Sequence, residues 1–496
     1  MVPLIDALKI VGVLGLGSVA AISVVLVTLF RSLHVLVVSN GGSTPMYGSR
    51  SRTNNQAKDE DETHCALFRH FPFLAGKLAW RELGHNYPTP IHRVNMKSPE
   101  GEAFSFSVKR EDLASELYGG NKVRTLQFAV GALEAMEVQP RIAALGSGGS
   151  NQIVATTVFA AGVHGIPVKP VWFTKDKADL DNTLNMLSTL SLSGDLGITW
   201  QSKAKRILGT LWKSFHAKDT VMWPPGGNCT LGVLGQAGGM LELAGQISRG
   251  DTADIDAIYL PIGSSCTISG LVLGLSLCRH LSLNAFKNPE FYIHGTIIHA
   301  GFAAIHRKIG FQKNTTWAKY MPLSICHSVK RACDLLKSLG CVDVWPLAKD
   351  AIKRSLRIAA DADVVGEYGG HSPASLAHSQ AYDNTAVVTD ASGKPQKELW
   401  VCGHFVAKNL VYLAHDAVSS AGKKNFMLWQ TKSSVQPRGT IDELSLMHKM
   451  PDGVKRWAHR GEAASDLREG AFDENDSAKY EGLMTPIASK MMMKGK

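Results

Sequence analysis

The sequence predicts an α/β protein built on doubly wound parallel sheets. The first observation is a strand, turn, helix and strand in succession: residues 141–145 are apolar, a glycine-rich turn and a helical pattern follow, and residues 168–173 are again strand-like. The second is the return of this alternation later in the chain, with buried-type strands at 255–261 and 292–298. Crossover helices between parallel strands produce such an alternation.

Composition sets the class of protein. At 496 residues the chain is long enough for one large or two ordinary domains, and 45% apolar with 19% charged residues is typical of a globular protein. The net charge is +10, but lysine and arginine are scattered, so a nucleic-acid partner is not expected. The eight cysteines contain no C-x-x-C pair, which favours reduced, mostly buried thiols in an intracellular compartment.

An uncharged stretch lies near the N-terminus, at residues 11–30, bracketed by Lys9 and Arg31. Twenty helical residues span about 30 Å, the thickness of a bilayer core. We therefore expect an uncleaved single-pass anchor within residues 1–38; a cleaved signal or organelle-targeting segment and a buried core helix are the alternatives. The more basic C-terminal flank orients the large remainder toward the cytosol and leaves the organelle open.

The rest of the chain divides by composition. Residues 39–64 are small, polar and charged, which predicts a disordered linker. Ordered sequence is expected over 65–435. Beyond it, 436–496 is richer in charge and loses its periodicity, and this C-terminal extension is predicted to be partly disordered.

A lysine at the start of a predicted helix is the first candidate for chemistry. Residues 104–108 alternate like a strand, Gly119 and Gly120 permit a tight turn, and a helical pattern begins at Asn121. Lys122 thus falls at the positive end of a helix, where the dipole and burial both lower the pKa of an amine. Such an amine suits a Schiff base, although a surface lysine beside a turn is the alternative.

Two further turns carry hydroxyl and amide groups. Residues 263–267 (GSSCT) follow a strand and lead into a helix, so their amides and hydroxyls could surround a phosphate; an ordinary strand-to-helix turn is the alternative. Ser150 and Asn151 follow the glycine-rich turn after 141–145. Taken alone, this pair is also typical of a helix N-cap.

Four segments in this order resemble one enzyme family. They are VKREDLASELYGGNKVR (108–124), GSGGSNQ (146–152), PPGGNCTLGVLG (224–235) and PIGSSCTISG (261–270). Together they resemble the pyridoxal-phosphate-dependent ACC deaminase and D-cysteine desulfhydrase family, a fold type II group related to the tryptophan synthase beta chain. The resemblance covers roughly Thr89 to Thr431. It implies two doubly wound domains, the smaller inserted at about 125–225, with pyridoxal 5′-phosphate in the cleft between them.

The resemblance also implies roles for individual residues. Lys122 would hold the cofactor and remove the α-proton. Ser150 would face the substrate carboxylate or carry a proton, and Tyr368, in EYGG, would be an active-site tyrosine. The cofactor would contact Lys122, Asn121, Asn151 (at its 3′ oxygen), Gly263, Ser264, Ser265, Cys266 and Thr267. No metal is implied: His371, His378 and His404 are expected to be packed or surface histidines.

Some positions depart from the family pattern. Gln152 stands where a histidine is more common, so substrate contacts are expected to differ. Phe405 and Val406 stand where the family has a tyrosine and a residue that contacts the pyridine nitrogen. Opening a cyclopropane ring relies on both positions, whereas β-elimination depends on them less. We therefore expect a lyase resembling D-cysteine desulfhydrase, acting on a small amino acid. The alternatives are an ACC deaminase, another β-eliminating or racemising activity of the family, and a membrane-tethered homologue without turnover. The family suggests a homodimer.

Overall fold

The computed structural model places most of the chain between residues 64 and 487. The anchor expected at 1–38 and nearly all of the linker lie outside the described residues, and none of the described helices has the length and apolar character of a membrane span. The described residues are 64–136, 140–173, 180–193, 199–201, 220–298, 316–366, 370–403, 405–450, 454–455, 458 and 484–487.

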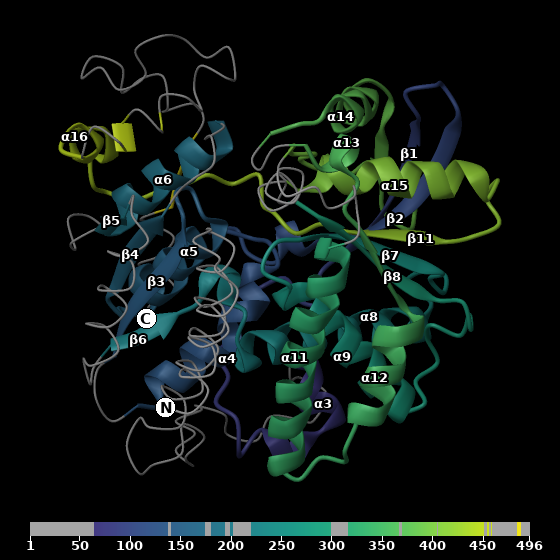
Figure 1. The fold of residues 1–496 in the computed structure, drawn as a ribbon, viewed down its shortest axis with the longest axis horizontal. Helices are drawn as coiled ribbons and strands as arrows, with labels where there is room; N and C mark the ends of the chain where they lie inside the picture. Colours follow the sequence, from purple (N-terminus) through teal and green to yellow (C-terminus); the bar gives the residue numbers. More distant parts are fainter. Residues whose placement is uncertain are drawn as a thin grey trace, which may run out of the picture.

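A seven-stranded sheet forms the larger part of the fold, at the right of Figure 1, in the order β10-β1-β2-β11-β7-β8-β9. Strands β2, β11, β7, β8 and β9 run parallel, and β1 is antiparallel to both of its neighbours. The bounds are β1 Ile91–Lys97, β2 Ala103–Lys109, β7 Ala257–Ile262, β8 Tyr292–Ile297, β9 Leu356–Ala359, β10 Val387–Thr389 and β11 Phe426–Trp429.

A second, four-stranded sheet lies at the left of Figure 1, in the order β5-β4-β3-β6, with all strands parallel. It is built from the region that shows the strand, turn, helix and strand alternation, which confirms the prediction of an α/β fold with parallel sheets. Its strands are β3 Arg141–Ser147, β4 Val168–Phe173, β5 Thr199–Gln201 and β6 Thr220–Trp223. A short pair, β12 Pro437–Arg438 and β13 Thr485–Pro486, lies near the C-terminus.

Helices cover both faces of the large sheet. Along β7, Ile258 and Leu260 belong to one buried cluster with helices α8 and α9, while Tyr259 belongs to another with α15. A strand covered on both faces is apolar throughout, as β7 and β11 are. The helices are α3 Ala66–His70, α4 Lys122–Glu134, α5 Asn151–Thr156, α6 Leu180–Ser193, α8 Thr230–Arg249, α9 Cys266–His280, α11 Thr316–Ser338, α12 Trp345–Arg354, α13 Ala362–Val365, α14 Pro373–Thr385, α15 Val406–Ser419 and α16 Glu443–His448.

Shorter helical turns join these elements. Helix α5 continues directly into a π-helical segment, Thr157–Val163, so the helical pattern that the sequence predicts through residue 161 is interrupted but not lost. The 3₁₀ turns are Pro72–Leu74, Glu111–Leu113 and Pro225–Gly227.

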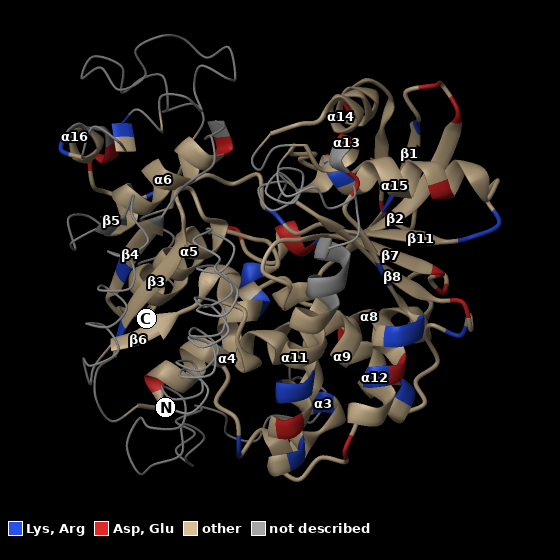
Figure 2. Ribbon diagram, viewed as in Figure 1, with Lys and Arg blue, Asp and Glu red and all other residues tan. Residues whose placement is uncertain are grey.

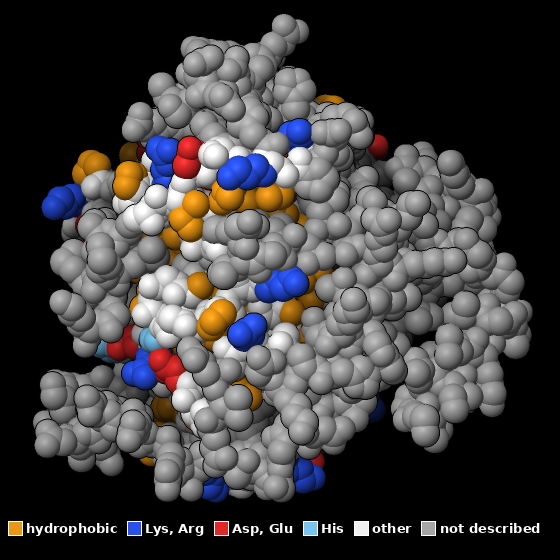
Figure 3. All heavy atoms as spheres, turned by 90° about the vertical axis from the view of Figure 1, so that its left-hand side faces the viewer, with side chains coloured by type: hydrophobic (Ala, Val, Ile, Leu, Met, Phe, Trp, Pro, Cys, Tyr) orange, Lys and Arg blue, Asp and Glu red, His pale blue; other side chains and the backbone are white. Residues whose placement is uncertain are grey.

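Charged side chains lie mostly at the periphery. In Figure 2 few charged residues fall on the strands of the sheets, and many fall on α11, α12 and the loops. On the face seen in Figure 3, the described lysine and arginine side chains are separated by hydrophobic and other groups and form no basic cluster there. No disulfide links the eight cysteines, all of which lie in the described part of the chain.

Candidate active site

The carboxyl ends of strands from both sheets contribute to one region. Strand β2 leads into the turn before Lys122, β7 into residues 263–267, and β11 into residues 430–436. From the smaller sheet, β3 leads into the turn before Ser150 and β6 into residues 224–228. Crevices at the carboxyl ends of parallel strands are the usual ligand sites of open α/β sheets.

Lys122 is the first residue of helix α4. Its Nζ donates a hydrogen bond to the carbonyl oxygen of Gly226 at 3.1 Å, so its side chain points toward the loop after β6. Burial lowers the pKa of this amine from its ordinary value, although the nearby Cys266 thiol acts in the opposite direction. A lowered pKa leaves more of the lysine in the neutral form that can act as a nucleophile or a base.

The loop that receives this hydrogen bond requires glycine. Gly226 and Gly227 have φ angles of 65° and 68°, in the left-handed region that favours glycine. A β-carbon on Gly227 would lie 2.5 Å from Cγ2 of Thr125 and 2.8 Å from Oε1 of Gln152. The Gln152 amide is satisfied when its nitrogen donates to the Gly226 carbonyl (3.2 Å) and its oxygen accepts from the Trp223 indole (3.0 Å). Gln152 therefore holds the Gly226 carbonyl in place by a hydrogen bond from the first turn of α5.

Asn151 has a defined amide orientation. Its Oδ1 accepts hydrogen bonds from the hydroxyl of Tyr118 and from Nδ2 of Asn185, both at 2.8 Å. Since two donors occupy the oxygen, the Nδ2 group remains as the donor for a further partner. Asn185 also donates to the carbonyl of Gly149 at 3.0 Å, which ties helix α6 to the glycine-rich turn. Tyr118 and Asn185 were not predicted from the sequence.

Ser150 occupies the N-cap position of α5, as the sequence alternative allowed, but its side chain makes no capping hydrogen bond. It is half-buried at the end of the turn after β3. Its hydroxyl is not used by the helix that it precedes. Ser150 and Asn151 therefore present a hydroxyl and an amide donor at the same strand end.

Residues 263–265 precede the 15-residue helix α9, whose first two residues are Cys266 and Thr267, and the first amides of this helix point back toward the turn. Ser265 has a φ of 67° and its side chain makes no capping bond. Asn228 donates to the carbonyl of Ser264 at 2.7 Å and to Oγ of Ser265 at 3.1 Å. A β-carbon on Gly263 would meet no atom closer than 3.5 Å, so the turn is open beside it.

The same turn is linked to the lysine helix. Asn121 donates from Nδ2 to Oγ1 of Thr267 at 2.7 Å, and Gln236 on α8 donates to the Asn121 carbonyl at 2.5 Å. The Cys266 thiol donates to the carbonyl of Gly227 at 3.4 Å, and burial raises its pKa to about 11. The structure thus brings Lys122, Asn121 and residues 263–267 together around the 224–228 loop.

A buried charge network lies behind this region. Lys109 donates to Glu242 (2.6 Å), and Arg124 donates to both Glu111 (2.6 Å) and Glu242 (2.8 Å). All four side chains are almost fully buried. Lys109 and Glu111 belong to a run of charged residues in the sequence, and the structure places both side chains inside the core.

Tyr368 and His404, which the sequence analysis singled out, lie outside the described residues. Phe405, Val406 and His371 are described. Val406 is the first residue of α15 and is fully buried in the cluster beneath that helix, and Phe405 packs against the same cluster. Neither supplies a polar group. His371 packs beside Gly403, where a β-carbon would lie 2.4 Å from the imidazole.

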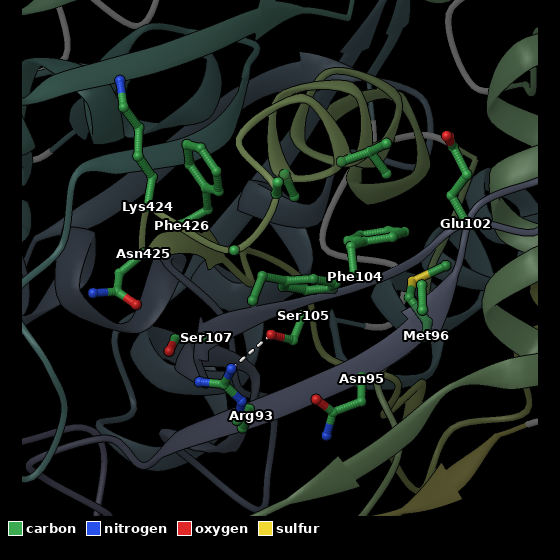
Figure 4. Close-up of a pocket in the computed structure, with 16 residues that line it drawn as sticks. Arg93, Asn95, Met96, Glu102, Phe104, Ser105, Ser107, Lys424, Asn425 and Phe426 are labelled. Atoms are coloured by element: carbon green, nitrogen blue, oxygen red, sulfur yellow. Dashed lines mark hydrogen bonds between the residues drawn. The ribbon is translucent and has the colours of Figure 1, made fainter.

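A hollow of about 610 Å³ lies away from all of these residues, between β1, β2, β11 and the end of α15 (Figure 4). Phe104 and Phe426 line one side, and Arg93 donates to Oγ of Ser105 at 2.6 Å on the other. It contains none of the predicted site residues.

Comparison with known proteins identifies the family. The pattern of the family described as pyridoxal-phosphate dependent enzyme matches residues 82–390. The chain belongs to this family. Its cofactor is therefore pyridoxal phosphate.

Relatives of this chain carry two names. It is 27% identical over 216 residues to a Thermotoga maritima protein named as a 1-aminocyclopropane-1-carboxylate deaminase, covering 42% of this chain and 66% of the relative. It is 28% identical over 204 residues to a D-cysteine desulfhydrase of Salmonella paratyphi A, covering 38% and 58%. A solved ACC deaminase homologue aligns over 73% of this chain and 94% of its own, at 20% identity and a TM-score of 0.49.

The residues present fit the cofactor of the family. The turn at residues 263–267, with space beside Gly263 and the first amides of α9 directed toward it, suits a phosphate, which is the most strongly charged part of pyridoxal phosphate. The Lys122 amine lies close to that turn, because the Gly226 carbonyl accepts hydrogen bonds from both Lys122 and Ser264. Because Oδ1 of Asn151 accepts from Tyr118 and Asn185, its Nδ2 group suits the hydroxyl oxygen that the pyridine ring carries.

Proposed function

We propose that this pyridoxal-phosphate-dependent enzyme is a lyase that removes the β-substituent of a small amino acid, with D-cysteine as the first candidate. The observation that carries the proposal is the position of the Lys122 amine beside the open turn at 263–267. Burial lowers the pKa of this amine. The relative named D-cysteine desulfhydrase supports the choice of substrate.

Each residue of the site has its own role in the proposed reaction. Bound pyridoxal phosphate supplies a carbonyl and an electron sink at the substrate α-carbon. Residues Gly263, Ser264, Ser265, Cys266 and Thr267 hold the phosphate, and Asn121 braces this turn through Thr267. Lys122, in its neutral form, attaches the cofactor and then takes the α-proton at Nζ. Asn151 donates to the 3′ oxygen, and Ser150 directs its hydroxyl to the substrate. Tyr368 is proposed as a further active-site residue. The overall reaction converts D-cysteine and water to pyruvate, ammonia and hydrogen sulfide.

A second candidate is 1-aminocyclopropane-1-carboxylate deamination, because three of the relatives carry that name. The side chains of Phe405 and Val406 argue against this deaminase activity. Neither side chain has a group that exchanges protons, and Val406 is fully buried. Opening a cyclopropane ring requires proton transfer to a ring carbon, whereas β-elimination of a thiolate requires only removal of the α-proton, assigned here to Lys122, and a good leaving group. A third candidate, a homologue that binds the cofactor without turnover, follows from the same two residues.

The full-length chain, supplied with pyridoxal phosphate, separates these candidates. Pyruvate release is measured with D-cysteine and L-cysteine, and 2-oxobutyrate release with 1-aminocyclopropane-1-carboxylate. Release from D-cysteine together with hydrogen sulfide supports the lyase. Release only from the cyclopropane substrate transfers the proposal to the deaminase. Cofactor binding with no product from any substrate supports the homologue without turnover.

We also propose the organisation of the whole chain. Residues 1–38 form a single-pass anchor or targeting segment, residues 39–64 a linker, and 65–435 the catalytic region with its smaller domain at about 125–225. Residues 436–496 are a C-terminal extension. The catalytic region faces the cytosol, and two copies form a homodimer. Carbonate extraction of membranes and light scattering of the detergent-solubilised chain test the anchor and the dimer.

A further inference from the structure

A second lysine lies next to the candidate site. Strand β11 ends at Trp429, and the chain then passes the turn that precedes Lys122. The amide of Asn121 donates to the carbonyl of Thr431 at 3.1 Å, and Lys432 forms a β-bridge with Gly120. Gly120 has a φ of 104°, and a β-carbon there would lie 2.7 Å from the Thr431 carbonyl oxygen. The backbone of Lys432 is therefore held against the lysine helix.

The Lys432 side chain is buried, with 2% of its surface exposed. Its Nζ donates a hydrogen bond to Oδ1 of Asp181 and lies 4.5 Å from the centre of the Trp400 ring. An ammonium has three N–H donors. Asp181 is the one hydrogen-bond acceptor for them among the residues that the structure describes, and Gln436 shares the same carboxylate oxygen at 2.9 Å. The other N–H groups of the buried Lys432 ammonium are therefore available to a ligand.

The partner of Lys432 belongs to the helix that also contacts Asn151. Asp181 lies in the first turn of α6. The next residue, Asn182, packs its carbonyl against Gly149, where a β-carbon would lie 2.3 Å away, and the same helix supplies Asn185 to Asn151. Lys432 therefore reaches from the side that carries Lys122 to the side that carries Ser150 and Asn151.

An amino-acid substrate brings a carboxylate into this region. Removing a carboxylate from water is costly unless a cation and hydrogen bonds receive it. Lys122 does not serve this purpose in the proposed reaction, because it must be neutral to take the α-proton. A buried ammonium with donors left over, beside the Ser150 turn, has the complementary charge.

We propose that Lys432 binds the α-carboxylate of the substrate, and that Asp181 and Trp400 hold its ammonium in position. This inference rests on the proposed function, in that it takes the substrate to be an amino acid. It makes Lys432 a substrate-binding residue that selects amino acids over the corresponding amines.

The test compares two ligands that differ only in the carboxylate. D-Alanine and ethylamine both carry the amine, and neither has a β leaving group, so binding is measured without turnover. The full-length chain with bound pyridoxal phosphate is titrated with each, and the visible absorbance of the cofactor reports binding. We expect the wild-type chain to prefer D-alanine, and Lys432→Gln to reduce this preference by about 10- to 100-fold, as expected for loss of a hydrogen bond to a charged group.

The control variant is Lys432→Arg, which keeps the cation and should retain most of the preference. Equal weakening of both ligands in Lys432→Gln, or an unchanged ratio, would show that the Lys432–Asp181 pair is only structural and would overturn the proposal.

A measurement on the wild-type chain covers the case in which Lys432→Gln does not fold. Acetate should compete with D-alanine and leave the affinity for ethylamine unchanged; a lack of competition contradicts the proposal. If D-cysteine yields no pyruvate while the D-alanine preference depends on Lys432, the proposed reaction fails and the carboxylate site stands.

Discussion

Nζ of Lys122 and the carbonyl oxygen of Gly226 are joined by a 3.1 Å hydrogen bond across the candidate site. The same oxygen accepts from Oγ of Ser264 at 3.3 Å. One backbone carbonyl therefore links the amine to the turn that suits a phosphate. Because Gly226 has a left-handed conformation, the position of this carbonyl depends on the glycine pair at 226 and 227.

Replacing Lys122 by alanine should remove the visible absorbance of the covalently bound cofactor and abolish product formation. The reason is that no other lysine side chain in the described residues hydrogen-bonds to the 224–228 loop. The matched control is Lys424→Ala, since Lys424 lies in the distant hollow of Figure 4 and forms a 3.7 Å ion pair with Glu290. An unchanged spectrum in Lys122→Ala would show that Lys122 does not hold the cofactor.

Gly227→Ala should reduce both stability and cofactor affinity. The left-handed conformation costs about 1–2 kcal/mol for a residue with a β-carbon, and the methyl group would also displace Thr125 and Gln152. Gly250→Ala is the control, because Gly250 has a φ of 82° but open space around its α-carbon. Thermal unfolding and a cofactor titration measure the difference. Equal losses in the two variants would contradict the steric argument.

Asn185→Ala should weaken cofactor binding without large loss of stability. It removes one of the two donors that fix the Asn151 amide, and the loss of one hydrogen bond of about 0.5–1.5 kcal/mol corresponds to a dissociation constant about 2- to 10-fold higher. Ser193→Ala, at the far end of the same helix, removes a 2.6 Å hydrogen bond to the Thr189 carbonyl and is the control. The proposed role of Asn151 fails if the two variants bind the cofactor equally well.

Glu242→Gln should destabilise the fold by about 3–5 kcal/mol, because it leaves Lys109 and Arg124 with one buried carboxylate fewer. Asp350→Asn is the control, since Asp350 pairs with Arg354 on the exposed surface of α12 and should change the free energy of unfolding little. Urea unfolding of the two variants measures both values. Comparable values would mean that the network contributes no more than a surface pair.

The stability of the wild-type chain should depend on pH through Glu242. Burial alone would raise the pKa of this carboxyl, but Arg124 and Lys109 lower it to about 2. A folded-state pKa below the unfolded value gives a stabilising contribution that is fully present above about pH 4.5 and is lost as the pH falls toward 2. Glu242→Gln should therefore show a shallower loss of stability than the wild type between these values. Parallel curves would contradict this assignment.

The elements that could be predicted from sequence are those with local signals. Strands β3 and β4 and the helix between them follow from a short apolar run, a glycine-rich turn and a second apolar run. The start of α4 at Lys122 follows from a glycine pair and the change to helical spacing. These signals come from residues that are neighbours in the chain, and local propensity acts over that range.

The residues that were missed act across long separations. Asn185 lies 34 residues from Asn151 and Arg124 lies 118 from Glu242, and no local pattern marks either as a partner. Lys432 is a single lysine in a polar segment, and its burial depends on α6 and Trp400. The turns of the candidate site could be identified from the sequence. The side chains that hold those turns in place could be identified only from the three-dimensional structure.

The buried charge network changes the meaning of the motif that contains it. Lys109 and Glu111 belong to the segment that most clearly resembles the family, yet their contacts are with Glu242 and Arg124 inside the core. A homologue that had lost its reaction would still need these charges in order to fold. A search pattern that includes them would therefore recover proteins with this architecture, active or not, whereas the positions proposed to react with or bind the substrate, Lys122, Ser150 and Lys432, would separate the enzymes from the rest.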